Sequence, residues 1–124
     1  MSVNILIVDD APFIRELIEQ IVTKEGWTVV GQAENGKQAI SMATEKNPDV
    51  IVMDLIMPEM SGLDATREIL NNNPDAKIIA CSTVNDQNLI MRALDAGCVN
   101  YITKPFEREK IVKVIKSTFD RLKK

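Results

Sequence analysis

The segment Val50-Ile51-Val52-Met53-Asp54 joins four consecutive apolar residues to a single carboxylate. Strands of a sheet that is covered on one face alternate apolar and polar residues, whereas strands buried on both faces are apolar throughout. The segment therefore predicts an interior strand of a parallel sheet, with Asp54 at its carboxyl end. Four other segments of strand length are also rich in apolar residues, and they comprise residues 4–8, 27–33, 77–81 and 101–103.

Segments with helical periodicity follow each predicted strand. After Pro12, for example, Phe13, Leu17 and Ile21 recur at helical spacing, and Gly26 marks the end of that helix. The other predicted helices lie between residues 36 and 47, 62 and 71, 86 and 96, and 108 and 123. Five such units are too few for a closed eight-unit barrel. We therefore predict an α/β fold, a doubly wound parallel sheet in the flavodoxin-like order 2-1-3-4-5 with five helices, as one domain spanning residues 1–124.

The composition excludes several classes of function. The net charge of −3 gives no electrostatic reason to expect nucleic acid or a membrane surface as the main partner. The chain contains no histidine, so it has neither a histidine base nor a histidine phosphodonor. It shows no signal peptide and no apolar run of membrane-spanning length. Cys81 and Cys98 match no zinc or C-x-x-C pattern, and we interpret them as reduced, buried thiols of a cytoplasmic protein.

Polar residues gather where the predicted strands end. Asp9-Asp10 follows the first strand, Asp54 ends the third, Ser82-Thr83 follows the fourth and Lys104 follows the fifth. In an open parallel sheet, ligands bind beyond the carboxyl ends of the strands, where the strand order reverses. In the predicted order that point lies between strands one and three, so we expect the acidic residues to share one crevice.

The residue types in this crevice predict phosphoryl chemistry. Three carboxylates would repel one another unless a cation neutralised them, and Mg²⁺ binds one or two carboxylates while keeping several waters. A carboxylate can act as the nucleophile that accepts a phosphoryl group. A lysine and a hydroxyl can then bind the oxygens of that group.

Four segments resemble the motifs of response-regulator receiver domains, most closely those of the stand-alone CheY-like chemotaxis type. They are residues 5–10 (ILIVDD), 52–58 (VMDLIMP), 78–82 (IIACS) and 101–106 (YITKPF). Each motif alone is weak, but the four in order at predicted strand ends are specific. The resemblance covers essentially the whole chain and implies a CheY-like fold.

The resemblance also implies roles for individual residues. Asp54 matches the phospho-acceptor, Lys104 the phosphate-binding lysine, Ser82 the switch hydroxyl and Tyr101 the aromatic residue that changes rotamer. The peptide bond before Pro105 is expected to be cis.

The metal ligands are implied in the same way. They are Asp9, Asp10, Asp54 and the backbone carbonyl of Ile56, and the metal is Mg²⁺. Asp10 matches the more direct ligand, while Asp9 acts partly through water.

The function implied is that of a two-component phosphorelay response regulator. A histidine kinase would donate the phosphoryl group, and a conformational switch would signal to an output protein, such as a flagellar switch component, in chemotaxis. We expect a cytoplasmic monomer that contacts neither nucleic acid nor membrane and is not an enzyme beyond weak self-phosphorylation and dephosphorylation. The output surface would surround Tyr101, between the fourth and fifth helices.

Three other functions are compatible with parts of the sequence. The chain could be a receiver domain cut from a longer DNA-binding regulator. It could be a Mg²⁺-dependent phosphatase resembling haloacid dehalogenases, but those enzymes carry an acid two residues after the nucleophile, where this chain has Ile56. A receiver that signals without phosphate is disfavoured by the intact acidic set.

Simpler structural interpretations stay open for several residues. Asp9-Asp10 and Ser82 are residue types that cap helices, Tyr101 could be a packing residue, and Thr83 offers a second hydroxyl beside Ser82. Ile56 and Val84 flank the expected phosphorylation site, and both are apolar. Because apolar groups would hinder an attacking water, we predict a long-lived phosphorylated state.

Overall fold

The computed structural model describes residues 3–83 and 86–122, with the side chains of residues 83 and 120–122 left out of the description. Five strands form one sheet in the order β2-β1-β3-β4-β5, and every neighbouring pair is parallel. The strands are β1 (Asn4–Val8), β2 (Thr28–Ala33), β3 (Val50–Asp54), β4 (Ile78–Thr83) and β5 (Asn100–Lys104). The predicted sheet and its strand order are confirmed.

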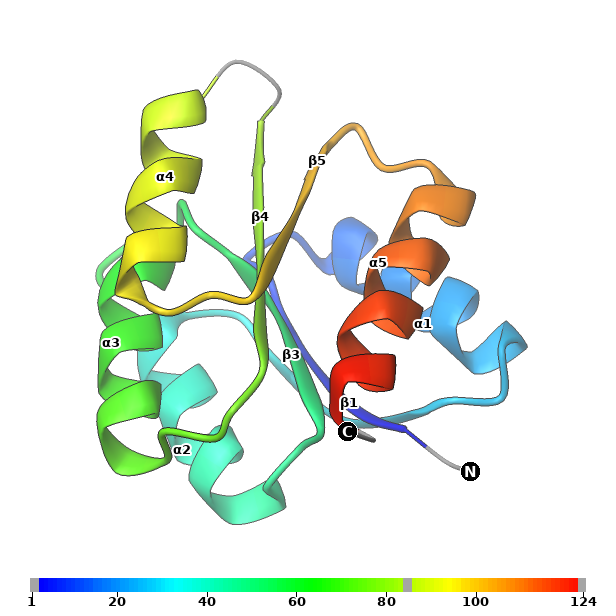
Figure 1. Cartoon of the computed structure of the whole chain (residues 1–124), viewed down its shortest axis with the longest axis horizontal. Helices are drawn as coiled ribbons and strands as arrows, with labels where there is room; N and C mark the ends of the chain where they lie inside the picture. The colour runs from blue at the N-terminus through cyan, green and yellow to red at the C-terminus, as the bar shows by residue number, and fades with distance from the viewer. Residues whose placement is uncertain (1–2, 84–85, 123–124) are drawn as a thin grey trace.

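Five helices alternate with the strands and cover both faces of the sheet (Figure 1). They are α1 (Pro12–Lys24), α2 (Gly36–Lys46), α3 (Gly62–Asn72), α4 (Gln87–Ala96) and α5 (Arg108–Leu122). The first and last pack on one face, and the middle three pack on the other (Figure 1). The result is a doubly wound α/β fold.

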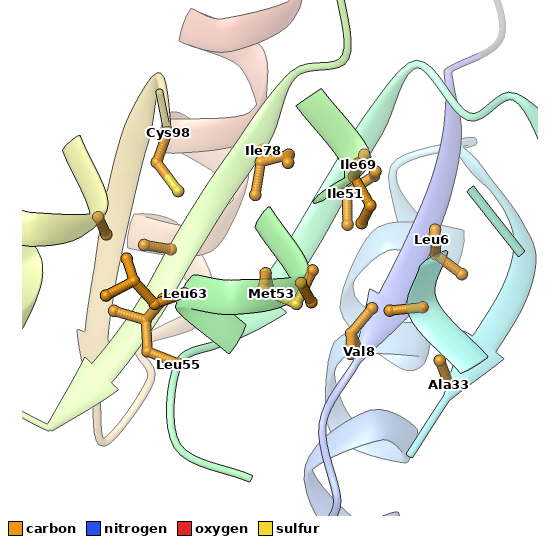
Figure 2. Close-up of a cluster of buried hydrophobic side chains, with 14 of the residues drawn as sticks. Leu6, Val8, Ala33, Ile51, Met53, Leu55, Leu63, Ile69, Ile78 and Cys98 are labelled. Carbon is orange, nitrogen blue, oxygen red and sulfur yellow. The ribbon is translucent and has the colours of Figure 1, made fainter. Parts of the chain in front are cut away.

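Each face of the sheet has its own apolar core because successive side chains of a strand point to opposite sides. Leu6 and Ile51 contribute to the core beneath α2, α3 and α4, part of which Figure 2 shows. Their chain neighbours Ile7 and Val52 contribute to the core beneath α1 and α5. All four are at most 1% exposed, which is why the apolar runs from Ile5 to Val8 and from Val50 to Met53 contain no polar residue to mark a solvent face.

The helix ends follow the local signals in the sequence. Pro12 occupies the first turn of α1, and the side chain of Asn35 accepts a hydrogen bond from the backbone N–H of Gln38 at the start of α2. Gly97 ends α4 in the left-handed conformation, with a φ of 118°. Glycine tolerates this conformation because it lacks a Cβ atom.

Some predicted boundaries need correction. β4 was expected to end at Cys81 but runs on to Thr83, because Ser82 pairs with Thr103 and Thr83 pairs with Lys104 of β5. The fourth helix begins at Gln87, and Asp86, expected to be its first residue, is its N-cap. The predicted end of α5 at residue 123 lies outside the described residues.

Two further features of the sequence can be checked against the fold. Cys81 and Cys98 are buried free thiols, and they belong to the cores on opposite faces of the sheet. Among the residues described, none of the helices is long and apolar enough to cross a membrane.

Candidate functional site

Three carboxylates meet at the carboxyl edge of the sheet. Asp9 follows β1, Asp10 is next in the chain, and Asp54 is the last residue of β3, the neighbour of β1. One oxygen of each lies within 4.8 Å of the others. Asp9 and Asp54 are only 2% and 4% exposed, whereas Asp10 is exposed. The expected acidic cluster is therefore present at the reversal point of the strand order.

Lys104 supplies a positive charge to this cluster from the end of β5. Its Nζ atom lies 3.1 Å from Oδ2 of Asp9, to which it donates a hydrogen bond, and 3.6 Å from Oδ1 of Asp54. The peptide bond between Lys104 and Pro105 is cis, as the sequence resemblance implied. Lys104 is therefore a paired residue of the crevice.

Burial dominates the electrostatics of Asp54. Loss of solvent and the neighbouring charge of Asp9 raise the pKa of Asp54 from 3.8 to about 6, although Lys104 acts in the opposite direction. The pKa of Lys104 is itself raised, because burial, which lowers it, is outweighed by the carboxylates of Asp54 and Asp9. The cluster carries more negative charge than one lysine neutralises.

Asp9 and Asp10 are held very differently. Every polar atom of Asp9 has a protein partner: its N–H donates to the Ala33 carbonyl, its Oδ1 accepts from the Ala11 N–H at 2.9 Å, its Oδ2 accepts from Lys104, and its carbonyl accepts from Arg15. Within the described part of the chain, the carboxylate of Asp10 makes no hydrogen bond or ion pair. Asp10 is therefore the carboxylate best placed to bind something from solvent.

The helix-cap interpretation of the acidic pair is wrong. The N-cap position of α1 is Ala11, which makes no side-chain capping bond. Asp9 instead closes a tight turn by accepting from the Ala11 N–H, and Asp10 is exposed at the cavity that it lines with Asp54.

Ser82 lies in the wall of a cavity of about 230 Å³, together with Asp10, Asp54, Ile56 and Lys104. Its hydroxyl oxygen is buried and has no hydrogen-bond partner among the residues that the structure describes. Ser82 does not cap a helix, because the N-cap of α4 is Asp86, whose side chain accepts from the Leu89 N–H. The side chain of Thr83, the competing hydroxyl, and the whole of Val84 lie outside the described residues.

Ile56 follows Asp54 in the loop that closes the site. Its N–H donates to Oδ1 of Asp54 at 3.2 Å, and its side chain is 58% exposed at the cavity. The loop returns tightly, since the Gly62 N–H donates to the Leu55 carbonyl at 3.0 Å. A Cβ atom at Gly62 would collide with the Asp54 backbone carbonyl, so the loop fits only glycine there.

Tyr101 is not part of the acidic crevice. It is 45% exposed on β5 and lines a separate hollow of about 350 Å³ with residues of α4, including Met91 and Leu94, which are themselves 60% and 37% exposed. A pure packing role would bury this ring, and its exposure among apolar neighbours leaves the predicted switch role in place as a proposal.

Arg15 is a residue at the site that the sequence reasoning did not select. Its Nη1 atom donates to the Asp9 carbonyl at 2.6 Å, and its Nε atom donates to Oε1 of Gln32 at 3.3 Å. The sequence places Arg15 in the first turn of α1, close beyond the acidic pair, but no spacing indicates that its side chain turns back to the Asp9 carbonyl.

The residues present fit a hard divalent cation. Carboxylate oxygens from three residues lie within 4.8 Å of one another, close enough to bind one ion. One of these residues, Asp10, is exposed and has no partner among the described residues. Burial, and after it the charge of Asp9, raise the pKa of Asp54, so a bound divalent ion would favour the ionised form of this carboxylate.

Comparisons with known proteins agree with this geometry. Residues 5–116 match the response regulator receiver domain. The chain is 43% identical to the chemotaxis protein CheY of Thermotoga maritima over 115 residues, which cover 93% of this chain and 96% of that protein. It is 42% identical to the chemotaxis protein CheY of Bacillus subtilis over 120 residues, covering 97% and 100% of the two chains.

A solved structure is also similar at the level of the whole fold. It is the CheX–CheY–BeF3–Mg²⁺ complex from Borrelia burgdorferi, whose matching chain is 30% identical with a TM-score of 0.90. The match covers 94% of this chain and 89% of that one.

Proposed function

This chain belongs to the response regulator receiver domain family, and from that membership we propose that it is a CheY-like response regulator whose Asp54 accepts a phosphoryl group with the help of Mg²⁺. The observation that carries the proposal is the convergence of Asp9, Asp10 and Asp54 beside Lys104 at one edge of the sheet. A cluster that held only an internal ion pair would not need a third carboxylate that faces solvent.

The positions of the residues support the chemistry that we propose for them. A carboxylate oxygen of Asp54 attacks phosphorus, a P–O bond forms, and the bond to the donor's leaving group breaks. Mg²⁺ would be held by Asp10, Asp54 and the Ile56 carbonyl, with Asp9 acting through water, and would neutralise phosphoryl oxygens. Lys104 and the unpartnered hydroxyl of Ser82 can each contact one of those oxygens.

The unpartnered Ser82 hydroxyl supports a switching role. A buried hydroxyl without a partner costs free energy, which a phosphoryl oxygen at Asp54 would recover. Two arrangements of the chain would then differ in their contacts with the phosphoryl group, so phosphorylation shifts their populations. Tyr101 would report that shift on the outer face of β5.

The names of the relatives support the partners that we propose. Two of them bear the name chemotaxis protein CheY, and we propose a histidine kinase as phosphodonor and a protein of the motility apparatus, such as a flagellar switch component, as output partner. The remaining expectations stay part of the proposal: a cytoplasmic monomer, Mg²⁺ as the metal, and only weak self-phosphorylation and dephosphorylation.

The test is intact mass after incubation with acetyl phosphate. We expect one added phosphoryl group on the wild-type chain with Mg²⁺ present, and none with EDTA or in Asp54→Asn. Asp64→Asn, which removes an exposed carboxylate of α3, is the matched control and should be phosphorylated normally. A folded wild-type chain that gains no phosphoryl group from acetyl phosphate or from a histidine kinase would contradict the proposal.

A further inference from the structure

Arg15 is a half-buried arginine that makes no ion pair with any side chain that the structure describes. Among those side chains, no carboxylate oxygen lies within ion-pair distance of its guanidinium group. It donates hydrogen bonds to two neutral acceptors instead. Nη1 donates to the Asp9 carbonyl at 2.6 Å, and Nε donates to the Gln32 side chain at 3.3 Å. The first bond is short, as charge-assisted hydrogen bonds are.

These two bonds join three elements at the edge of the acidic site. Arg15 lies on α1, Asp9 follows β1, and Gln32 belongs to β2, where it pairs with Ile7. The planar guanidinium group carries donors in a rigid fork, so one side chain can hold two acceptors in a fixed relation. A lysine offers its donors from a single atom and cannot reproduce that arrangement.

The bond to the Asp9 carbonyl matters for Asp10. A backbone carbonyl and the next N–H belong to one planar peptide unit, so fixing the carbonyl of Asp9 fixes the direction in which the chain enters Asp10. Since the carboxylate of Asp10 has no partner of its own in the described structure, the backbone alone aims it at the site. From this geometry we propose that Arg15 is a positioning residue that orients Asp10 toward the cation site beside Asp54.

This inference rests on the proposed function only in requiring that the acidic cluster bind a divalent cation. An electrostatic effect of Arg15 and a positioning role predict opposite changes in Mg²⁺ affinity when Arg15 is removed. A nearby positive charge repels Mg²⁺, so a purely electrostatic effect predicts that removing Arg15 tightens Mg²⁺ binding. A positioning role predicts that removal weakens it, because the main ligand loses its orientation.

The experiment measures Mg²⁺ affinity by isothermal titration calorimetry, without phosphodonor, alongside thermal unfolding. We expect Arg15→Ala to weaken Mg²⁺ binding about tenfold, the lower end of the effect of losing a residue that orients a metal ligand. Arg15→Lys should weaken it nearly as much although the charge is retained. Gln32→Ala, which removes only the second acceptor, should have a smaller effect in the same direction.

Arg67→Ala is the matched control, because Arg67 lies on the surface of α3 with only an exposed partner, Asp64. Its Mg²⁺ affinity should equal that of the wild type. Unchanged or tighter Mg²⁺ binding by cooperatively folded Arg15→Ala and Arg15→Lys would overturn the positioning role. If wild type itself binds no Mg²⁺, the proposed function fails, and that outcome is distinct from equal binding by wild type and variant.

Discussion

The ammonium group of Lys104 lies 3.1 Å from the buried carboxylate of Asp9, although 95 residues of chain separate them. Asp9 is 2% exposed, so this contact supplies the counter-charge that solvent cannot. Without bound metal, Lys104 therefore acts as the internal cation of the acidic cluster. A divalent ion entering the cluster competes with it for the same carboxylates.

That competition predicts two opposite effects of Lys104→Met. Without Mg²⁺ the variant should lose about 2–3 kcal/mol of unfolding free energy, because a buried carboxylate loses its charged partner. Its Mg²⁺ affinity should rise several-fold, because the ion no longer displaces a lysine. Denaturant unfolding with and without Mg²⁺ measures both effects.

The control is Lys116→Met, which removes an exposed lysine 3.7 Å from half-buried Glu25. Because Lys116 is exposed and Glu25 keeps Arg108 as a second partner, neither quantity should change much. An Lys104 variant with wild-type stability in EDTA would show that the pair does not hold the cluster together.

The raised pKa of Asp54 predicts a pH-dependent stability in the absence of metal. Its pKa is 3.8 in the unfolded reference and about 6 in the folded chain, so the folded state binds the proton more tightly. The free-energy cost of ionising the buried Asp54 carboxylate lowers the free energy of unfolding. This cost is absent below pH 3.8, grows as pH rises, and is complete above about pH 6. A shift of this size corresponds to roughly 3 kcal/mol.

Asp54→Asn should remove that cost. In EDTA, its gain in unfolding free energy over wild type should be small near pH 4 and increase toward pH 7, as measured by urea unfolding. Asp64→Asn provides the comparison for the loss of an exposed carboxylate. A gain that stays constant across this range would mean that Asp54 is not destabilised by its burial.

Much of the fold could be predicted because its signals are local. The apolar run before Asp54 marks a covered strand, and Gly97 marks a helix end at the residue where the left-handed turn occurs. The carboxyl end of β4 could not be predicted in this way. It is set by pairing with β5, which lies about twenty residues further along the chain.

The candidate site was predictable to a similar extent. Because parallel strands end at one edge, Asp9, Asp54 and Lys104 were expected together, and they are. The different situations of Asp9 and Asp10 depend on individual hydrogen bonds. The bond from Arg15 to the Asp9 carbonyl leaves no pattern in the sequence, since nothing in the spacing tells which helical side chain turns back toward the sheet.

The unpartnered hydroxyl of Ser82 predicts that Ser82→Ala separates stability from switching. Replacing a buried hydroxyl that lacks a partner should leave the unphosphorylated chain as stable as the wild type or more stable, by up to about 1 kcal/mol. The phosphorylated variant should still form but should lack the conformational response, as followed by the NMR resonances of Tyr101 before and after phosphorylation.

Thr118→Ala is a useful contrast, because that buried hydroxyl does have a partner, the Val114 carbonyl at 2.9 Å. It should lower stability while leaving the response of Tyr101 intact. Wild-type resonance changes in phosphorylated Ser82→Ala would remove Ser82 from the switch.

The apolar side chain of Ile56 predicts a slow loss of the phosphoryl group. It stands at the cavity beside Asp54, where a water attacking phosphorus would have to pass, and it can neither orient nor activate that water. Ile56→Asn should shorten the phosphorylated state several-fold by admitting and hydrogen-bonding water, and Ile56→Leu should not. The decay of the phosphorylated mass after removal of acetyl phosphate measures each lifetime.

Because the Ile56 N–H bonds to Asp54 through the backbone, all three chains should be phosphorylated equally at the start. A wild-type half-life of only seconds at room temperature would show that Ile56 does not shield the site.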